Sequence, residues 1–327
     1  MGKKNMASSQ IISLTAVLTF ACTTVHELPK IHQLENYRSD IHMPLPDRTH
    51  APPEILLRYL RKLDNKRDYE LYMPSRYEKT IIRNAIALLP KREKSVLQNR
   101  LIGIYFIKNF TGNGLCEWVL DRSGMVYIFF VFNPSAFGKT ASELLTEKEN
   151  TCFIKDDTSI KIIVDCGKKI PGFYYILLHE TAHAADYVLN VTPYVDEDFR
   201  KFMNIERAET EFTKNYWIGY NTTKEHFIFS NKVYFYNIGK PKLKISQSVA
   251  VYKALSRSPF ATLYGSISWA EDLAELAAYN YITHVMGEPF RIYVLRDKKE
   301  LFSFYPMESP QIIKRLPQLE ALYSGGI

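Results

Sequence analysis

The first half of the chain contains two kinds of apolar pattern. Residues 53–63 carry apolar side chains at helical spacing, and Ser75 with Glu78 forms a capping-box pattern before a second helix that reaches residue 89. From residue 101 onward the pattern changes to short runs rich in β-branched and aromatic residues, which indicates strands. We expect strands of an antiparallel or mixed sheet at residues 101–110, 116–121, 125–134, 151–155 and 160–165.

The second half of the chain is more helical. Residues 176–188 are apolar or helix-favouring without Gly or Pro, which predicts a helix over 171–190. Residues 193–258 are mixed and rich in aromatic residues, and we expect this insertion to form part of a cleft wall. Further helices are expected at 247–255, 269–285 and 311–322, with a hairpin at 289–306. This order of elements predicts an α+β fold in which the helix at 171–190 packs across a twisted sheet.

The helix at 171–190 carries the sequence His179-Glu180-Thr181-Ala182-His183, an HExxH motif. Residues four apart lie on one face of a helix, so both imidazoles can bind one metal ion. Glu180 is rotated about 100° from His179, where its carboxylate can reach a metal-bound water without binding the metal. The alternative is a pair of core histidines beside an incidental glutamate.

The metal site needs a third ligand, and the helix at 269–285 offers two candidates. Glu271 and Glu275 are four residues apart on one face of a helix rich in Ala and Leu. A carboxylate packed on such a face needs a cation or a hydrogen-bonding partner. A zinc ion held by His179 and His183 would be that cation, and either glutamate can complete the site.

These two segments together resemble a known family. LLHETAHAADY, followed by Tyr264-Gly265 shortly before Glu271 in AEDLAE, is similar to the gluzincin metallopeptidases. The pattern is that of the catalytic domain of anthrax lethal factor and related secreted peptidases. The resemblance covers about residues 101–285 and implies a zincin-like fold, with a twisted sheet packed against the HExxH helix and a second helix that carries the glutamate ligand.

The resemblance also implies a role for each matching residue. His179, His183 and Glu271 would bind one zinc ion per chain, with Glu275 as the alternative to Glu271. Glu180 would be the catalytic base, and Tyr264 would donate a hydrogen bond in the transition state. Asp186 and Glu275 would contact the ligands rather than the metal. The strand near residues 151–155 would be an edge strand that pairs with the substrate backbone.

The implied chemistry is peptide-bond hydrolysis by an exported zinc-dependent endopeptidase. Two imidazoles and one carboxylate leave zinc an open position, where a water has its pKa lowered to about 7. Glu180 would take its proton, and Tyr264 with zinc would stabilise the oxyanion. One alternative is a noncatalytic envelope lipoprotein with a structural zinc site, for which His284 is the nearby candidate fourth ligand. Another is a degenerate peptidase that serves as a binding module.

Composition adds limits on size and partners. The chain has 327 residues, 46% of them hydrophobic, enough for one large domain or two modest ones. The net charge is +7, and the basic residues are scattered along the sequence and do not form a basic patch. The expected partner is therefore a protein or peptide substrate and not a nucleic acid. We expect a tether at 23–52, an N-terminal helical segment at 53–98 and a zinc peptidase domain at 99–327.

The N-terminus has the pattern of an export signal. Lys3 and Lys4 precede an apolar run from Ile11 to Ala21, so residues 1–22 are expected to be a signal peptide. Cys22 stands where a bacterial lipoprotein is lipidated, while cleavage after Ala21 and an uncleaved anchor are alternatives. The expected location is the cell envelope or the medium, with membrane contact only through this anchor.

The other cysteines are Cys116, Cys152 and Cys166. Cys152 and Cys166 flank an apparent hairpin, so a disulfide between them is a candidate in an oxidising compartment. The alternative is three buried thiols.

Overall fold

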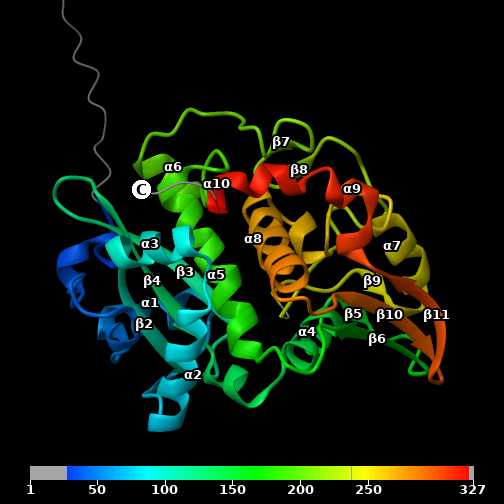
Figure 1. The fold of residues 1–327 in the computed structure, drawn as a ribbon, viewed down its shortest axis with the longest axis horizontal. Coiled ribbons are helices and arrows are strands. Elements are labelled where there is room, and N and C mark those ends of the chain that lie inside the picture. The colour runs from blue at the N-terminus through cyan, green and yellow to red at the C-terminus, as the bar shows by residue number, and fades with distance from the viewer. Residues whose placement is uncertain (1–27, 237, 324–327) are drawn as a thin grey trace, which may run out of the picture.

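The computed structural model describes residues 28–236 and 238–323, and these form an α+β structure around one long central helix. This helix, α5 (Gly172–Leu189), contains the HExxH motif. Figure 1 shows a four-stranded sheet with α1 to α3 on one side of α5, and α4, α7, α8 and the smaller sheets on the other side. The expected α+β class is confirmed.

The four-stranded sheet is mixed. Its strand order is β1-β2-β4-β3, with β2 parallel to β4 and the other neighbours antiparallel. Because β2 and β4 lie inside the sheet and are covered on both faces, their sequences are nearly continuous apolar runs. Strand β3 is an edge strand, paired from Gly114 with Phe132 to Leu120 with Val126. The strands are β1 (Glu70–Tyr72), β2 (Leu101–Lys108), β3 (Gly114–Leu120) and β4 (Val126–Phe132).

Helices cover the two faces of this sheet with separate sets of apolar residues. Leu56, Leu57 and Leu60 of α1 pack on one face, whereas α2, α3 and α5 pack on the other. The predicted capping box at Ser75 and Glu78 is present at the start of α2. The bounds are α1 (Glu54–Leu63), α2 (Arg76–Ala87) and α3 (Lys91–Arg100). Since α2 and α3 share the core of α5, residues 53–98 pack as part of one body with the rest of the described chain.

The remaining strands form three small sheets. The hairpin expected at 289–306 is present and pairs with β6, in the order β11-β10-β6. Strand β5 pairs in parallel with β9, and β7 pairs with β8. The strands are β5 (Phe153–Ile154), β6 (Ile160–Asp165), β7 (Trp217–Gly219), β8 (Thr222–Thr223), β9 (Leu243–Lys244), β10 (Arg291–Arg296) and β11 (Lys299–Phe304).

The remaining helices include one that packs along α5 and carries Glu271. This helix, α8 (Trp269–Asn280), continues into a π-helical turn at Tyr281–Val285. The helix expected at 311–322 is broken, because Pro317 cannot continue a helix from α9 into α10. The other bounds are α4 (Ala141–Asn150), α6 (Glu197–Phe202), α7 (Ser248–Leu255), α9 (Pro310–Ile313) and α10 (Glu320–Tyr323).

The segment predicted to be a tether is folded onto the domain from residue 28 onward, so that prediction is wrong for residues 28–52. The buried guanidinium of Arg48 donates to the carbonyl oxygens of Leu97 and Leu101. The ring of His32 stacks on Trp118 at a centroid distance of 3.9 Å. The sequence pattern missed these contacts because they are made by single residues and not by a periodic face.

The predicted disulfide is also wrong. Cys116, Cys152 and Cys166 are buried free thiols. The expected hairpin between Cys152 and Cys166 does not form, because β5 pairs with β9 whereas β6 pairs with β10. The two cysteines therefore flank strands that belong to different sheets.

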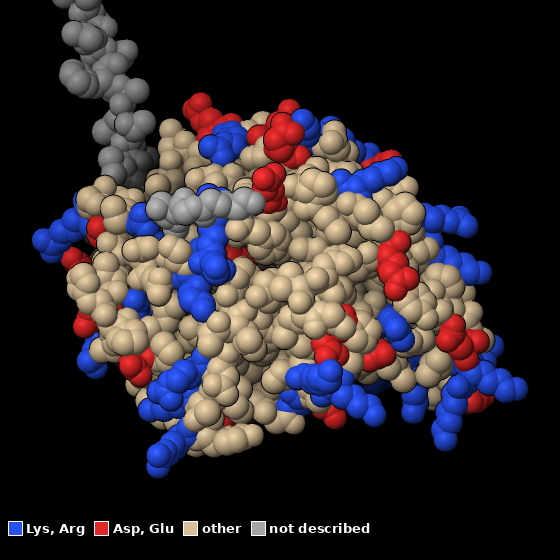
Figure 2. Space-filling view, viewed as in Figure 1, with Lys and Arg blue, Asp and Glu red and all other residues tan. Residues whose placement is uncertain are grey.

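Two further observations concern the surface and the N-terminus. On the face drawn in Figure 2, Lys and Arg side chains are interspersed with Asp and Glu, and the centre of this face is mostly uncharged. Within residues 28–236 and 238–323, no helix has the length and apolarity that crossing a membrane requires. The predicted signal peptide at 1–22, including Cys22, lies outside the described residues.

Candidate metal centre

Helix α5 is buried on nearly every side, which explains its apolar sequence. It packs against β3 on one side and α8 on the other, and all of its residues from Gly172 to Tyr187 are buried. A helix covered all round needs no polar face, so the two histidines and the glutamate of its HExxH motif are ionisable exceptions that require partners. Asn190 ends the helix in the left-handed conformation, with φ of 53°.

The structure brings His179, His183 and Glu271 together. The Nε2 atoms of the two histidines are 3.2 Å apart, and Oε2 of Glu271 lies 3.1 Å from Nε2 of His179 and 3.5 Å from Nε2 of His183. One ligand atom from each residue lies within 4.8 Å of the others. Among the described residues, this is the only such group of three potential metal ligands.

The donor set fits a zinc ion. Two imidazole nitrogens and a carboxylate oxygen that converge on one point are the ligands of a catalytic zinc site. On its other side, Nδ1 of His179 lies 3.2 Å from Oε1 of Glu275. A proton on Nδ1 would face this carboxylate and leave the Nε2 lone pair directed at the candidate metal position, which is the arrangement found in carboxylate–histidine–zinc sites.

Glu275 accepts several hydrogen bonds and lies next to Nδ1 of His179, on the side of the ring away from Glu271. Its Oε1 accepts hydrogen bonds from Lys148 Nζ at 3.0 Å and from the Tyr175 hydroxyl at 2.5 Å, and its Oε2 accepts from Thr262 Oγ1 at 2.7 Å. Burial raises the pKa of Glu275, but the ammonium of Lys148 and the hydrogen bonds outweigh burial and lower it to about 2. Glu275 is therefore a fixed anion that contacts a ligand and not the metal position.

Glu180 points toward the beginning of β3. A Cβ atom added to Gly114 would lie 2.6 Å from Oε1 of Glu180 and 2.6 Å from Cγ2 of Ile176. The carboxylate thus fits against a glycine on an edge strand, where it is outside the ligand group of His179, His183 and Glu271. Burial raises the pKa of Glu180, opposed by the nearby charges of His179 and His183.

Tyr264 lies beside the same ligand group. Its hydroxyl donates to Oε1 of Glu271 at 3.3 Å, and its ring centroid lies 5.9 Å from that of His179. The Lys148 ammonium lies over the Tyr264 ring, 3.7 Å from its centroid. Tyr264 belongs to a single 3-10 turn, Tyr264–Ser266, that leads into α8.

Asp186 makes its hydrogen bonds with the loop that follows α5. It accepts hydrogen bonds from the backbone nitrogen of Thr192 at 2.8 Å and from its Oγ1 at 2.5 Å. Burial raises the pKa of Asp186, while these bonds and the nearby His183 lower it. Asp186 therefore fixes the loop after α5, next to His183.

The strand that lies next to Glu180 is β3, which is an edge strand of the four-stranded sheet. Strand β5, within residues 151–155, pairs with β9, whereas the strand that runs along α5 next to Glu180 is β3. The expected pairing of a substrate with residues 151–155 stays a prediction, and β3 is a second edge strand near the site. The strand order β1-β2-β4-β3 leaves β3 at the edge of the sheet. This order depends on pairing between distant segments, which the pattern of apolar residues within each strand does not specify.

Sequence reasoning missed several residues that shape the site. Lys148, Tyr236 and Gly114 lie in segments where the sequence shows no functional motif. One usable signal was the capping box formed by Thr140 and Glu143, which starts α4, the helix that carries Lys148.

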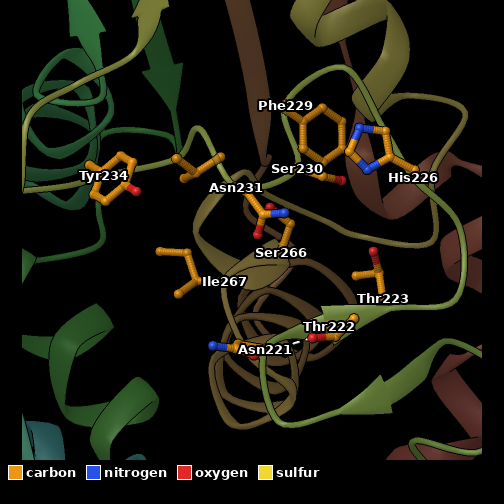
Figure 3. Close-up of a pocket in the computed structure, with 11 residues that line it drawn as sticks. Asn221, Thr222, Thr223, His226, Phe229, Ser230, Asn231, Tyr234, Ser266 and Ile267 are labelled. Atoms are coloured by element: carbon orange, nitrogen blue, oxygen red, sulfur yellow. Dashed lines mark hydrogen bonds between the residues drawn. The ribbon is translucent and has the colours of Figure 1, made fainter.

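A hollow of about 260 Å³ lies next to Ser266 and Ile267, which come two and three residues after Tyr264. Figure 3 shows uncharged polar side chains around it, including Asn231, Thr223 and Ser266, beside the rings of Phe229 and His226. Tyr234 lines it from the insertion, and its hydroxyl accepts from Lys242 Nζ at 3.1 Å.

Comparison with known proteins adds no relative: no family model, curated protein or solved structure matches this chain. The assignment of the site therefore depends on its own geometry. That geometry is a buried His179–His183–Glu271 group with Glu180 outside it, held against an edge strand.

Proposed function

We propose that this chain is an exported zinc-dependent endopeptidase with a zincin-like fold of the gluzincin type. The observation that carries the proposal is the convergence of His179, His183 and Glu271 within 4.8 Å, with Glu180 beside them but not among the ligands. A mixed sheet packed on the HExxH helix, with the glutamate on a second helix along it, supports the fold assignment.

His179, His183 and Glu271 would hold the zinc ion. When bound, zinc polarises a substrate carbonyl and makes a nearby water more acidic. Glu180 would accept a proton from the attacking water and pass it to the leaving amine, because its carboxylate is the free base at the site. Tyr264 would donate its hydroxyl hydrogen to the oxygen that gains negative charge.

The substrate would lie along the beginning of β3, because Gln33 bridges Leu120 at the other end of its outer edge. One side of β3 pairs with β4, and Gly114 at its beginning is in contact with Glu180. Backbone groups on the other side of an edge strand can pair with an extended peptide. Such pairing would bring a peptide carbonyl next to Glu180, which favours a peptide over a small molecule as the substrate.

A structural zinc site is the second candidate. Structural sites usually have four protein ligands, whereas the described residues contain a group of three. His284, the candidate fourth ligand of this alternative, is exposed on the π-helical turn after α8 and is not part of this group. The three-ligand set therefore favours the catalytic type.

The test combines metal content with peptide cleavage. We expect about one zinc ion per wild-type chain, little zinc in His183→Ala and Glu271→Ala, and zinc retained with lower affinity in Glu275→Ala. A mixture of internally quenched fluorescent peptides should be cleaved by the wild type, and Glu180→Gln should retain zinc without cleavage. Zinc binding without any peptide cleavage would support the structural alternative, and absence of zinc uptake would refute both.

A further inference from the structure

Tyr236 lies beside Tyr264 at the candidate metal centre, although it comes from the insertion at 193–258. Its ring lies nearly perpendicular to that of Tyr264, with a centroid distance of 6.3 Å and an angle of 78°. The preceding residue, Phe235, packs on Tyr264 in the same edge-on manner at 5.1 Å. Burial and the charges of Glu275, Glu271 and Glu180 raise the pKa of Tyr236 well above its usual value, so its hydroxyl keeps its proton.

The hydroxyl of Tyr236 is linked to the beginning of the edge strand. It accepts a hydrogen bond from Asn113 Nδ2 at 3.0 Å, and Asn113 directly precedes Gly114, the glycine against Glu180. Among the described residues, the Tyr236 hydroxyl donates to no acceptor. Because the Asn113 amide occupies a lone pair of the oxygen, the phenolic proton remains available to another group at the start of β3.

The backbone at Tyr236 is held in an unfavourable conformation. Its φ of 55° lies in the left-handed region, which is rare for aromatic residues and common for glycine. The backbone nitrogen donates to Thr151 Oγ1 at 3.0 Å, which fixes this conformation. Strain of this kind persists where the surroundings demand a particular side-chain direction, and here it directs the phenol toward Asn113.

We propose that Tyr236 is a substrate-binding residue, whose hydroxyl donates a hydrogen bond to a backbone carbonyl of a peptide lying along β3. Asn113 acts as a positioning residue that orients this hydroxyl. The proposal rests on the peptidase function proposed above, and it names the ligand class of the site as an extended peptide backbone. The carbonyl belongs to a peptide unit beside the cleaved bond, so the contact forms when the substrate binds.

The decisive variant is Tyr236→Phe, which removes a single oxygen atom. The matched control is Tyr234→Phe, because Tyr234 is two residues away in the same insertion and its hydroxyl contacts Lys242 instead. With an internally quenched peptide that the wild type cleaves, we expect KM of Tyr236→Phe to rise about threefold to tenfold, with kcat nearly unchanged. Zinc content and Tm should match the wild type, and Tyr234→Phe should stay within about twofold.

Direct binding gives a second readout that does not depend on turnover. In a Glu180→Gln background, the Kd of the same intact peptide can be measured by fluorescence anisotropy. We expect Tyr236→Phe to weaken binding by the same factor as it raises KM. Asn113→Ala should weaken binding in the presence of Tyr236 and have no further effect when Tyr236 is already Phe.

Three results would overturn the proposal. One is an unchanged KM in Tyr236→Phe, and another is an equal rise in Tyr234→Phe. The third is a loss confined to kcat, because a contact made on binding lowers the free energies of bound substrate and transition state alike. If the wild type binds zinc and cleaves peptides while Tyr236→Phe behaves normally, only this inference fails. If the wild type cleaves no peptide, the proposed function fails first.

Discussion

The ammonium nitrogen of Lys148 lies 3.0 Å from Oε1 of Glu275, and the exposed fractions of the two side chains are 3% and 1%. Neither charge has access to bulk water, so each depends on the other for its stability in the interior. The pair also links two parts of the site, because Glu275 contacts His179 while Lys148 stands over the ring of Tyr264.

Replacement of Lys148 alone should therefore strongly destabilise the folded protein. We expect Lys148→Met to lower the free energy of unfolding by about 3–5 kcal/mol, because Glu275 would remain as an uncompensated buried anion. The double variant Lys148→Met, Glu275→Gln should recover much of this loss. Its zinc affinity should nevertheless stay about 10- to 100-fold weaker, since His179 would no longer face a carboxylate. Chemical denaturation and chelator competition measure the two effects, and full zinc affinity in the double variant would contradict the role of Glu275.

Gly114 should be intolerant of a side chain for a local reason. A Cβ atom there would lie 2.6 Å from the Glu180 carboxylate, so Gly114→Ala must displace the proposed base. We expect kcat to fall at least about tenfold while zinc content is retained, because none of the three ligands is touched. Gly138→Ala is the control, since a Cβ atom there meets nothing within 4 Å. Equal activity of the two alanine variants would refute this placement of Glu180.

The buried pair of Arg315 and Asp272 should contribute strongly to stability. Arg315 Nη1 and Nη2 donate to the two oxygens of Asp272 at 2.9 and 2.7 Å, which ties the C-terminal segment to α8. Arg315→Met should lower the free energy of unfolding by about 3–5 kcal/mol, because Asp272 would lose its only charged hydrogen-bonding partner among the described residues. Lys201→Met removes an exposed ion pair with Asp198 and should change the free energy of unfolding by less than about 1 kcal/mol. Similar unfolding midpoints for both variants would contradict this difference.

Glu93 should make stability depend on pH. It is buried in α3, and burial raises its pKa to about 8. The Glu93 carboxyl has a pKa of about 8 in the folded state and 4.5 in the unfolded state, so the folded state binds its proton more tightly. The free energy of unfolding is therefore highest below pH 4.5 and falls as the pH rises to about 8. Glu93→Gln should be more stable than the wild type at pH 8, and the difference should shrink at pH 5. Thermal unfolding at both pH values is the measurement, and a constant difference would exclude this titration.

Local sequence signals were sufficient wherever a structural element depends on neighbouring residues. The capping box at Ser75 and Glu78 specified the beginning of α2, and the apolar run around residues 176–188 specified α5. The spacing of His179 and His183 placed both imidazoles on one face, because four residues make about one helical turn. The sequence thus determined the main elements and the two histidines of the candidate site.

Tertiary structure decided which residues from distant segments meet. Glu275 faces Nδ1 of His179 while Glu271 faces Nε2, a distinction that depends on how α8 packs against α5. Strand β3 became the edge beside Glu180, and β5 joined β9, through pairings between segments far apart in the chain. Lys148 and Tyr236 reach the site from α4 and the insertion for the same reason. Contacts of this kind depend on packing and strand register, which single-sequence periodicity does not encode.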